Sequence, residues 1–368
     1  MSFLSRYDSN TIALFIRLGA IAIAGIGFLL FLYLRPMVIS GFAEPLKISA
    51  EPVLIELPDV NRSTKRSFDD ATCDKMTDMV EIDRQLLSYD KHNLRTYPGY
   101  KGDDGLLHFK ERSNVVALDM DKSLFSSKRK IDLANVNGQH CADLVFSELK
   151  SFIFEDSVRF SVALNKGDGS FEMQEHKTSN SRELFSERMV REILEIVSRR
   201  DITAKKASSK VHMDWGDFDG NQTGDFAILT ENYFDLNVDI LYTELDPQGG
   251  MKFKGKKSFT IDWFMFARDA IDLDIEDYNA DGKADILVRH RFRFARDISV
   301  SFAINNGNGF TAHKDSIVTL PEDFDLVNVY ASEKDDSLDI NFDGAADVVN
   351  IGEVNNKPYL VGFIVNPQ

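Results

Sequence analysis

Asp277-Tyr-Asn-Ala-Asp-Gly-Lys-Ala-Asp285 runs directly into the apolar stretch Ile286-Leu-Val288. Two further stretches repeat this pattern, and they are Asp217-Phe-Asp-Gly-Asn-Gln-Thr-Gly-Asp225 and Asp339-Ile-Asn-Phe-Asp-Gly-Ala-Ala-Asp347. Carboxylates and amides recur at the odd-numbered positions. The apolar, partly β-branched run after each ninth residue is a strand signal. Each stretch is therefore expected to be a tight loop that joins two β-strands.

The odd positions of these loops offer oxygen ligands to a hard cation. Ca²⁺ takes six to eight oxygens at about 2.3–2.6 Å, and alternate side chains plus one backbone carbonyl on a tight turn converge on one point. An EF-hand needs Glu at its twelfth position, where this chain has Ile228, Val288 and Asn350. Asp-Gly and Asn-Gly also form solvated turns without metal, but three copies in one register favour binding.

We therefore predict about three Ca²⁺ sites, each on a loop between strands. The metal has a structural role in this hypothesis, because it would lock the hairpin. The predicted ligands, with position seven contributing its backbone carbonyl, are Asp217, Asp219, Asn221, Thr223 and Asp225, then Asp277, Asn279, Asp281, Lys283 and Asp285, and then Asp339, Asn341, Asp343, Ala345 and Asp347.

A fourth copy, Asn135-Val-Asn-Gly-Gln-His-Cys-Ala-Asp143, keeps the register but loses the charge. Asn135, Asn137 and Gln139 are neutral and only Asp143 is a carboxylate, so weak or no calcium binding is expected. The ninth-position aspartates recur about every 60 residues, which indicates a repeated β unit. A wider gap before Asp225 contains apolar residues at helical spacing, which predict an inserted helix over about 181–199.

A second element recurs after the loops: Phe160–Phe171 and Val300–Phe310 each combine a strand, a Gly-rich turn and an aromatic residue, as in a hairpin. Together with the loops, this pattern resembles the FG-GAP and VCBS repeats of integrin-like and bacterial cell-surface β-propellers, from Ile131 to the C-terminus. The resemblance implies four-stranded blades with the metal loop between the first two strands, in proteins that bind proteins or glycans and are seldom catalytic. The chain departs from it in the degraded first loop, in Gln222 where the family prefers Gly, and in having fewer than seven copies.

The expected fold is all-β: a propeller or propeller-like array of four to five four-stranded blades. The last unit stops after Tyr359–Val365, one strand short, and Gly102–Arg112 resembles the missing turn and strand. We predict that an N-terminal strand completes the last blade and hides its edge, with an open arc as the alternative. Apolar residues within Phe68–Leu87 predict a helix there.

Residues Leu18–Leu34 are uncharged and apolar, which is long enough to span a bilayer. The predicted organisation is a cytoplasmic tip and transmembrane anchor over 1–35, an extended Pro-containing linker over 36–66, a helix and strands completing the propeller over 67–130, and the repeats over 131–368. A cleaved signal peptide, ending at Gly41-Phe-Ala43, is the alternative. The calcium loops favour an extracytoplasmic placement of the bulk of this single-pass protein, in the periplasm or at the cell surface, because calcium is abundant there.

The chain has two cysteines and a net charge of -16, and both features bear on its compartment and its partners. A Cys73–Cys141 disulfide would pin the loop that lost its charge, and two unpaired thiols are the equal alternative. The acidity argues against non-specific binding to nucleic acid or to anionic lipid. Arg289, Arg291 and Arg293 stand out from this acidic background, because they lie on one face of a predicted strand. They either form a patch that binds an anion or a partner, or belong to an outer strand paired with neighbouring carboxylates.

Three functions remain open from the sequence. The preferred hypothesis is a membrane-anchored, calcium-stabilised scaffold that binds a protein or glycan, as part of an envelope assembly. The alternative is a hydrolase or lyase acting on polysaccharide or phosphoester in the propeller channel. No local hydrolase or zinc motif occurs, so we expect no enzyme. A calcium-responsive sensor would in addition need a shape change on binding.

Overall fold

The computed structural model describes residues 43–58, 65–84, 91–111, 114–119, 129–137, 141–151, 156–173, 211–231, 235–245, 251–262, 270–291, 296–325, 338–355 and 357–367. The chain divides into two compact units, Met1–Ala43 and Glu44–Gln368. The predicted anchor and the inserted helix over about 181–199 lie outside the described residues. Within the described residues, no helix is long and apolar enough to cross a membrane.

Glu44–Gln368 forms five antiparallel sheets, which we call blades I to V. Blade I contains β3 (Lys65–Asp69), β4 (Asp78–Arg84), β5 (Lys91–Tyr97) and β8 (Asn114–Asp119). Blade II contains β9 (Arg129–Ala134), β10 (Asp143–Ser151), β11 (Asp156–Asn165) and β12 (Phe171–Met173). Blade III contains β13 (Val211–Gly216), β14 (Asp225–Glu231), β15 (Asp235–Leu245) and β16 (Met251–Asp262).

Blade IV contains β17 (Ala270–Glu276), β18 (Asp285–Arg291), β19 (Asp297–Asn305), β20 (Phe310–Ala312) and β21 (Ser316–Thr319). Blade V contains β22 (Phe324–Asp325), β23 (Val348–Val354), β24 (Lys357–Phe363) and, as its outer strand, β2 (Val53–Glu56). Two small sheets accompany the blades: β1 (Lys47–Ile48) with β25 (Val365–Asn366), and β6 (Gly99–Lys101) with β7 (Leu107–Phe109).

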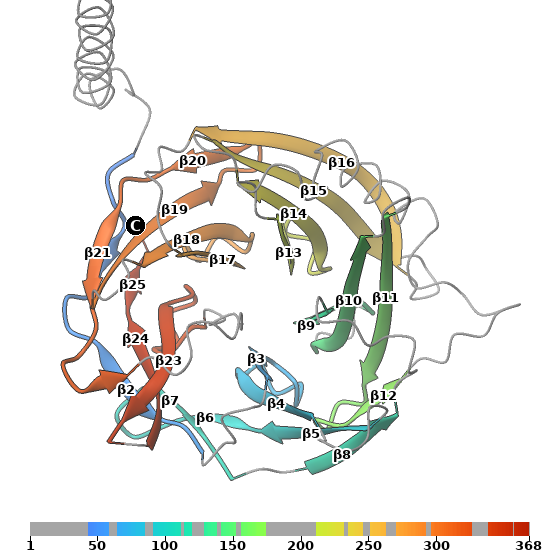
Figure 1. The fold of residues 1–368 in the computed structure, drawn as a ribbon, viewed down its shortest axis with the longest axis horizontal. Helices are drawn as coiled ribbons and strands as arrows, with labels where there is room; N and C mark the ends of the chain where they lie inside the picture. The colour runs from blue at the N-terminus through green and yellow to red at the C-terminus, as the bar shows by residue number, and fades with distance from the viewer. Residues whose placement is uncertain are drawn as a thin grey trace, which may run out of the picture. The chain divides into compact units, whose positions relative to one another are not determined.

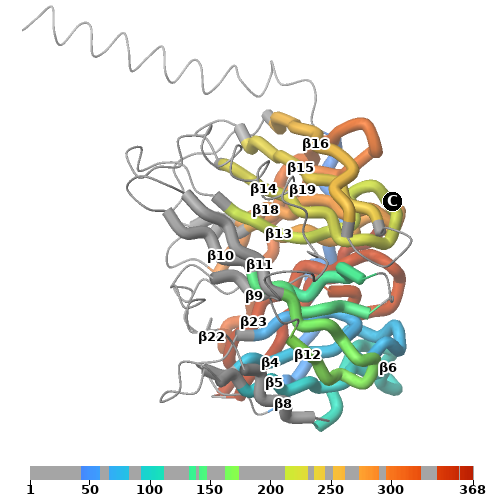
Figure 2. The backbone as a smooth tube through the Cα atoms, turned by 90° about the vertical axis from the view of Figure 1, so that its right-hand side faces the viewer, coloured from blue at the N-terminus to red at the C-terminus, as the bar shows by residue number. Residues whose placement is uncertain are grey.

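The blades surround a common centre and make a five-bladed β-propeller (Figure 1). Strands β3, β9, β13 and β17 lie nearest the centre, and β8, β16 and β21 lie at the rim (Figure 1). The side view shows β13 to β16 of blade III running beside one another (Figure 2). This arrangement confirms the predicted all-β propeller at the upper end of four to five blades.

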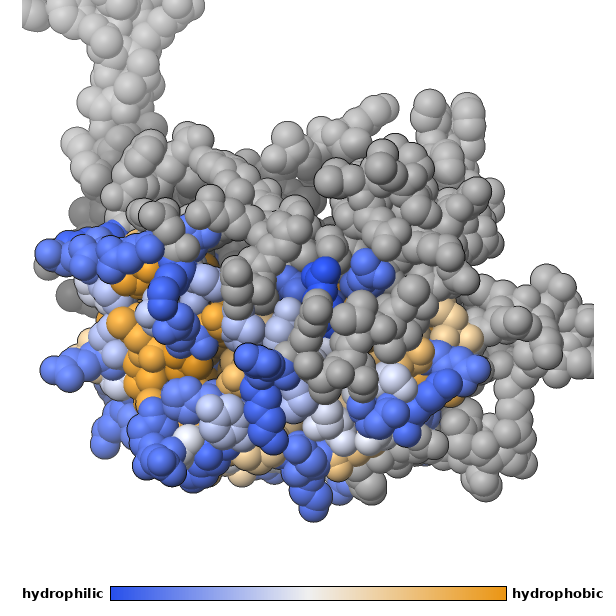
Figure 3. Space-filling view, turned by 90° about the horizontal axis from the view of Figure 1, so that it is seen from below, coloured by the Kyte–Doolittle hydropathy of each residue, from blue (hydrophilic) through white to orange (hydrophobic). Residues whose placement is uncertain are grey.

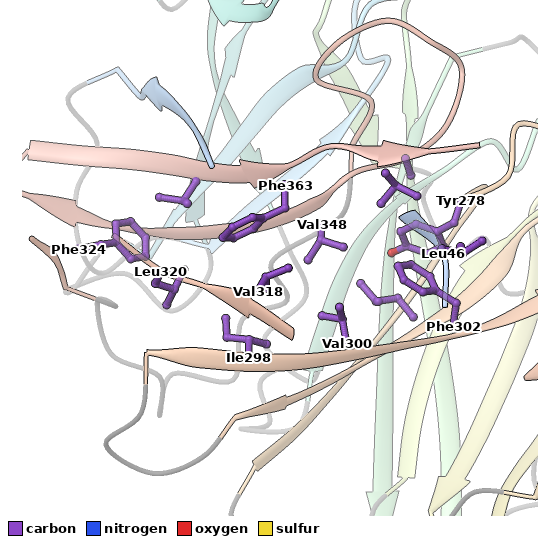
Figure 4. Close-up of a cluster of buried hydrophobic side chains, with 14 residues drawn as sticks. Leu46, Tyr278, Ile298, Val300, Phe302, Val318, Leu320, Phe324, Val348 and Phe363 are labelled. Atoms are coloured by element: carbon purple, nitrogen blue, oxygen red, sulfur yellow. The ribbon is translucent and has the colours of Figure 1, made fainter. Parts of the chain in front are cut away.

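The core lies between the faces of neighbouring blades. In blade III the whole run Phe226–Leu229 is buried, because a second strand is covered on both faces and so does not alternate. One cluster between blades IV and V gathers Tyr278, Phe302 and Phe363 around the aliphatic residues of β19 and β21 (Figure 4). Another cluster fills the junction between blades V and I and contains Ile340, Leu360 and Met79.

The surface is largely polar. Among the described residues, the large apolar side chains that are exposed are Leu54, Tyr100 and Ile317. Seen from below, hydrophilic residues are spread over the described surface around an apolar area on its left (Figure 3).

An N-terminal strand does complete the last blade, as predicted, but it is β2 rather than Gly102–Arg112. Val53–Glu56 pairs with Tyr359–Gly362 of β24. The Gly102–Arg112 region instead contributes β7, which pairs with β6. Its Leu107 is fully buried and its backbone N–H donates to the Ile340 carbonyl, so the hairpin packs at the junction between blades V and I.

The helix predicted within Phe68–Leu87 is wrong. Lys65–Asp69 and Asp78–Arg84 are paired strands, joined by a bend over Ala71–Met76. Met79, Val80 and Ile82 are all buried, because β4 is a second strand covered on both faces. That dense apolar run imitates helical spacing.

Candidate metal centres

All five blades place a nine-residue loop between their first two strands. We call Asp70–Asp78 loop I, Asn135–Asp143 loop II, Asp217–Asp225 loop III, Asp277–Asp285 loop IV and Asp339–Asp347 loop V. The side chain at position two is buried in every copy, and these residues are Ala71, Val136, Phe218, Tyr278 and Ile340. The loops are thus fixed to the inter-blade core at their start.

Loops I, III, IV and V share a left-handed backbone at positions four and six. In loop IV these are Ala280 (φ 60) and Gly282 (φ 79), and in loop V they are Phe342 (φ 61) and Gly344 (φ 93). Glycine adopts this region without steric cost, whereas a bulky residue such as Phe342 does not. The loop geometry is therefore retained against an unfavourable local preference.

The carboxylate at position one holds this backbone in place. Asp277 accepts hydrogen bonds from the Asp281 N–H at 3.2 Å and the Gly282 N–H at 2.7 Å. Asp217 and Asp339 accept the equivalent bonds in loops III and V. Burial raises the pKa of Asp217 and of Asp277, and these N–H donors oppose the rise.

The aspartate at position nine is buried and ties the loop to the third strand. Asp225 accepts hydrogen bonds from Phe218 N at 3.0 Å and Thr243 N at 2.7 Å. Asp285 accepts the corresponding pair, and Asp347 accepts from Ile340 N and from Val365 N of β25, directly after the third strand of its blade. Desolvation raises the pKa of Asp225, Asp285 and Asp347 to about 8, against the lowering effect of these donors. A cation bound beside them would displace protons.

Loop I, Asp70-Ala-Thr-Cys-Asp-Lys-Met-Thr-Asp78, was missed by sequence reasoning although its register is the same. Asp70 accepts hydrogen bonds from the N–H groups of Asp74 at 3.0 Å and Lys75 at 2.8 Å, as in the other loops. Asp78 is fully buried and accepts from Gly99 N at 2.8 Å. The signal that could have found it is the spacing of Asp70, Asp74 and Asp78 alone.

Loop III has a donor set that suits calcium. One ligand atom each from Asp217, Asp219 and Asp225 lies within 4.8 Å of the others. Asp219 Oδ1 is shielded from solvent and has no hydrogen-bond partner among the described residues. Its Oδ2 accepts from the Lys254 ammonium at 2.8 Å, so a cation already lies against this carboxylate. Asn221 Oδ1 accepts the Thr223 N–H at 2.7 Å, which brings the amide into the loop.

Loop I shares this convergence with loop III, whereas loops IV and V do not. Asp70, Asp74 and Asp78 of loop I converge within the same 4.8 Å. Throughout the described ranges, no other group of three acidic, His or Cys side chains does so, which leaves loops IV and V less convergent. In loop IV the Lys283 Nζ lies 3.9 Å from Asp281 Oδ2. In loop V the Asn341 side chain donates to Asp343 at 2.9 Å.

Loop II keeps the scaffold without the charges. Asp143 accepts hydrogen bonds from Val136 N at 3.2 Å and Asn165 N at 2.8 Å, and burial raises its pKa to about 6. Cys141, at position seven, forms a disulfide with Cys73 at position four of loop I. The sequence had left this pairing open, and the bond cross-links blade II to blade I.

A repeated backbone bond connects neighbouring loops. The N–H at position eight of one loop donates to the carbonyl at position one of the preceding loop, in the pairs Ala142 to Asp70 (2.9 Å), Gly224 to Asn135 (3.0 Å), Ala284 to Asp217 (2.7 Å) and Ala346 to Asp277 (2.7 Å). A Cβ at Gly220 would lie 3.6 Å from the Gly282 carbonyl, and one at Gly344 would lie 3.6 Å from Ala280 Cβ. Loops III, IV and V are therefore in direct contact.

Two asparagines that sequence reasoning had not assigned a role reinforce these junctions. Asn165 Nδ2 donates to the Ala71 carbonyl at 2.8 Å, and Asn305 Nδ2 donates to the Phe218 carbonyl at 2.9 Å. Both lie at the end of a third strand, before the Gly-rich turns of the β11–β12 and β19–β20 hairpins. The repeated Asn before these turns was the available signal.

Arg289 cannot belong to an exposed anion patch, because its side chain is fully buried. It lies on β18, a second strand, where blade III has Leu229 at the matching place after its loop. Arg289 Nη1 donates to the Val349 carbonyl of blade V at 2.6 Å, and Nη2 lies 3.9 Å from Asp274 Oδ2. It is thus a buried link between blades IV and V. The side chains of Arg291 and Arg293 lie outside the described residues.

Comparison with known proteins adds little to this geometry. No family model matches the chain, and no curated protein matches it. A chain of the S. cerevisiae core factor crystal structure is similar at 10% identity and a TM-score of 0.36, covering 90% of this chain, which spans only 64% of that one. The Vanderwaltozyma polyspora Nup133 β-propeller domain is similar at 7% identity and a TM-score of 0.30, covering 88% of this chain and 93% of that chain. Because these TM-scores are low, the assignment of the fold is based on the five sheets of this chain and not on these similarities.

Proposed function

We propose that this protein is a calcium-stabilised β-propeller scaffold, of the kind that FG-GAP and VCBS repeats build. It binds a protein or glycan partner as a subunit of an extracytoplasmic assembly, and its N-terminal apolar segment holds it at the membrane. The observation that carries the calcium part is the convergence of Asp217, Asp219 and Asp225 in loop III. Three carboxylates, the Asn221 amide and the Thr223 carbonyl provide the oxygen ligands that Ca²⁺ prefers.

In this proposal the cation held by loop III has a structural role. Bound Ca²⁺ would neutralise the carboxylates that repel one another around Asp219 and would stiffen the turn between β13 and β14. The Asp217 and Asp225 carboxylates already orient the backbone, so the loop is preorganised for the ion. Loop I is the second candidate, through Asp70, Asp74 and Asp78.

The disulfide supports the extracytoplasmic part of the proposal. Cys73 and Cys141 are the two cysteines of the chain, and they are bonded to each other. Structural disulfides persist in oxidising compartments and are rare in the cytosol. An outward-facing propeller also meets calcium at the concentrations that exposed loops of modest affinity need.

The contact between neighbouring loops supports the scaffold part of the proposal. Loop IV contacts loop III on one side and loop V on the other, and positions four to six of these loops include exposed residues such as Ala280, Asp281 and Asp343. Connected loops on a rigid ring offer a continuous polar surface, and such loops are where binding residues concentrate. This surface is the first place to seek the partner.

Calorimetric titration of the full chain with CaCl₂, with MgCl₂ as the comparison, tests the calcium part. We expect saturable calcium binding with a dissociation constant of roughly 10⁻⁴–10⁻³ M, as in extracellular modules. Asp219→Asn should abolish the loop III site, whereas Asn137→Ala in loop II should leave binding unchanged. Equal binding by the Asp219→Asn protein and the parent would remove loop III from the proposal.

Pull-down from detergent-solubilised membranes tests the scaffold part. The tagged chain and its Asp219→Asn variant are compared in calcium and in chelator. A stoichiometric partner that both chelator and the variant remove supports the proposal. If the chain is recovered alone in both conditions, a protein-binding role is excluded under those conditions, and glycan arrays and hydrolase or lyase substrates then decide between the remaining candidates.

A further inference from the structure

The segment Glu44–Leu57, which we call the strap, reaches its blade from the far end of the chain. Its strand β2 is the outer strand of blade V and pairs with β24, and β1 pairs with β25. The partners Glu56 and Lys357 are separated by 301 residues. In blades II and III the outer strand follows the third strand directly in sequence. The strap is therefore attached to blade V only through non-covalent contacts.

The strap seals the hydrophobic cores on both sides of blade V. Leu46 is 4% exposed and belongs to the cluster between blades IV and V, where it lies near Tyr278 and Phe302 (Figure 4). Ile55 and Leu57 are 0% and 3% exposed and belong to the cluster between blades V and I. Departure of the strap would thus expose parts of two cores.

The junction between blades V and I depends on this seal more than the other junctions do. The four other junctions each carry the backbone bond from position eight to position one. At this junction the equivalent hydrogen bond would join the Thr77 N–H to the Asp339 carbonyl. Both residues are described by the structure, and they do not form this bond. Leu107 N to Ile340 O, at 2.9 Å, is the bond that replaces it, and Leu107 packs in the same cluster as Ile55 and Leu57.

The remaining contacts of the strap are short strands, hydrogen bonds and exposed ion pairs, and the hydrogen bonds include Ser49 N to Ile364 O at 2.8 Å and Ile364 N to Ser49 Oγ at 2.9 Å. β1 has two residues and β2 has four, compared with seven in each of β23 and β24. The Glu56–Lys357 pair measures 2.8 Å, with 55% and 62% of the two side chains exposed. Exposed pairs of this kind contribute little to stability and are screened by salt. The buried side chains of Leu46, Ile55 and Leu57, with the partly buried Ile48 and Val53, supply the apolar part of this hold.

We propose that the strap is a releasable closure of the ring. Its detachment opens the junction between blades V and I and uncovers the edge of β24. That edge then accepts an extended strand with apolar residues two positions apart, as Ile55 and Leu57 are. Blade V is in this way both the seam of the propeller and a latent strand-binding site.

Hydrogen exchange on the full chain tests release. We expect strap amides to exchange about tenfold or more faster than those of β14, a central strand, because local opening costs less than global unfolding. The Leu107 amide should exchange together with the strap. The junction amides of Ala142, Ala284 and Ala346 should stay protected. Strap amides as slow as those of β14, or a Leu107 amide that stays protected when the strap exchanges, would overturn the proposal.

A cross-link supplies the matched control. Lys47 and Asn366 are register partners on β1 and β25, and both are exposed. The double variant Lys47→Cys and Asn366→Cys should, once oxidised, slow exchange of the strap and of Leu107 together. Lys47→Ser with Asn366→Ser should behave as the parent does. A lock that slows the strap without slowing Leu107 would show that the strap does not control the junction.

A labelled peptide of sequence 44–57 tests the uncovered edge. It should bind the full parent chain slowly, at the rate of strap opening, and should not bind the oxidised cross-linked variant. A peptide carrying Asn at the positions of Ile55 and Leu57 should not bind either chain. Equal binding to parent and locked protein, or binding to neither, would reject β24 as the acceptor.

Discussion

Loops II and III occupy the same place in neighbouring blades, yet they hold their shape by different chemistry. Both have a buried aspartate at position nine that accepts a backbone hydrogen bond within the loop and one from the third strand. Loop III adds convergent carboxylates, whereas loop II has neutral side chains and a disulfide. The ninth aspartate is thus the requirement of the fold. The convergent carboxylates of loop III, which are the proposed cation ligands, are additional to it, and the described residues of loop II include no such group.

Removal of the disulfide should produce the largest effect on loop II. For Cys73→Ser with Cys141→Ser, the sequence separation of 68 residues gives a loss of about 4 kcal/mol in unfolding free energy on the chain-entropy model. Denaturant unfolding of the parent and the variant in chelator measures it. A loss below about 1 kcal/mol would mean that hydrogen bonds already hold loop II without the cross-link.

Replacement of the ninth aspartate should damage both loops alike. Asp143→Ala and Asp225→Ala each strand two backbone N–H donors, so we expect each to cost about 3 kcal/mol without metal. Thermal unfolding in chelator checks this. Asp219→Ala is the control, because Asp219 is a proposed cation ligand and not a position-nine acceptor, and it should not destabilise the metal-free protein. If Asp225→Ala is harmless while Asp143→Ala is not, the shared role of position nine is contradicted.

Stability should depend on pH differently for the ninth aspartate of loop II and for those of loops III to V. The pKa of Asp225, Asp285 and Asp347 is raised to about 8, so between about pH 4 and 8 the native protein binds more protons than the unfolded chain. Stability of the metal-free protein therefore falls as pH rises through that window. For Asp143 of loop II the window closes at about 6.

Bound calcium should reverse this trend, because it takes the place of the protons. At about 100 times the dissociation constant it adds about 2.7 kcal/mol, so the rise in Tm on adding calcium should be larger near pH 8 than near pH 5.5. Differential scanning fluorimetry at both values, with and without CaCl₂, measures the difference. A calcium effect independent of pH would mean that the ion does not compete with protons at position nine.

The smallest effect should come from the lysine that lies against loop III. Lys254→Met removes an ammonium from Asp219, and since such a half-exposed pair is worth about 0.2–1 kcal/mol, calcium affinity should rise up to about fivefold. Calorimetry measures it. Lys252→Met is the matched control, because Lys252 lies on the same strand and forms its ion pair with Glu244. Among the described residues, no ion pair joins Lys252 to a carboxylate of loop III. Equal affinities would show that Lys254 does not compete for the site.

The sequence was sufficient to locate a loop where the same residue type has the same structural role in every repeat. The ninth aspartate and the strand after it located four of the five loops, because a buried acceptor and an apolar second strand recur at fixed spacing. Loop I was hidden because Thr72 stands at position three, where the other charged loops have Asp or Asn, and Lys75 stands at position six, where loops IV and V have Gly. Its backbone geometry, with Cys73 and Lys75 at positive φ, is visible only in three dimensions.

The errors concern partners that lie far apart in sequence. Gly102–Arg112 resembles a blade's turn and outer strand, but Val53–Glu56 takes that place, and no local pattern chooses between them. Both sequence interpretations of Arg289 assume an exposed strand, because alternating polar and apolar residues suggest that one face of the strand contacts solvent. A second strand is instead covered on both faces. The acceptor that accommodates the buried Arg289 is the carbonyl of Val349, 60 residues away.

The pairing of β2 with β24 also has a consequence for biosynthesis. During synthesis Val53–Glu56 emerges early, yet its partner at Tyr359–Gly362 appears about three hundred residues later. Blades II and III are complete within their own stretches of chain, so they can form as they are made. Blade V must wait, and contacts so distant in sequence slow folding. A ribosome-bound chain would therefore carry the apolar residues Ile55 and Leu57 uncovered, which makes this segment the natural target for a chaperone.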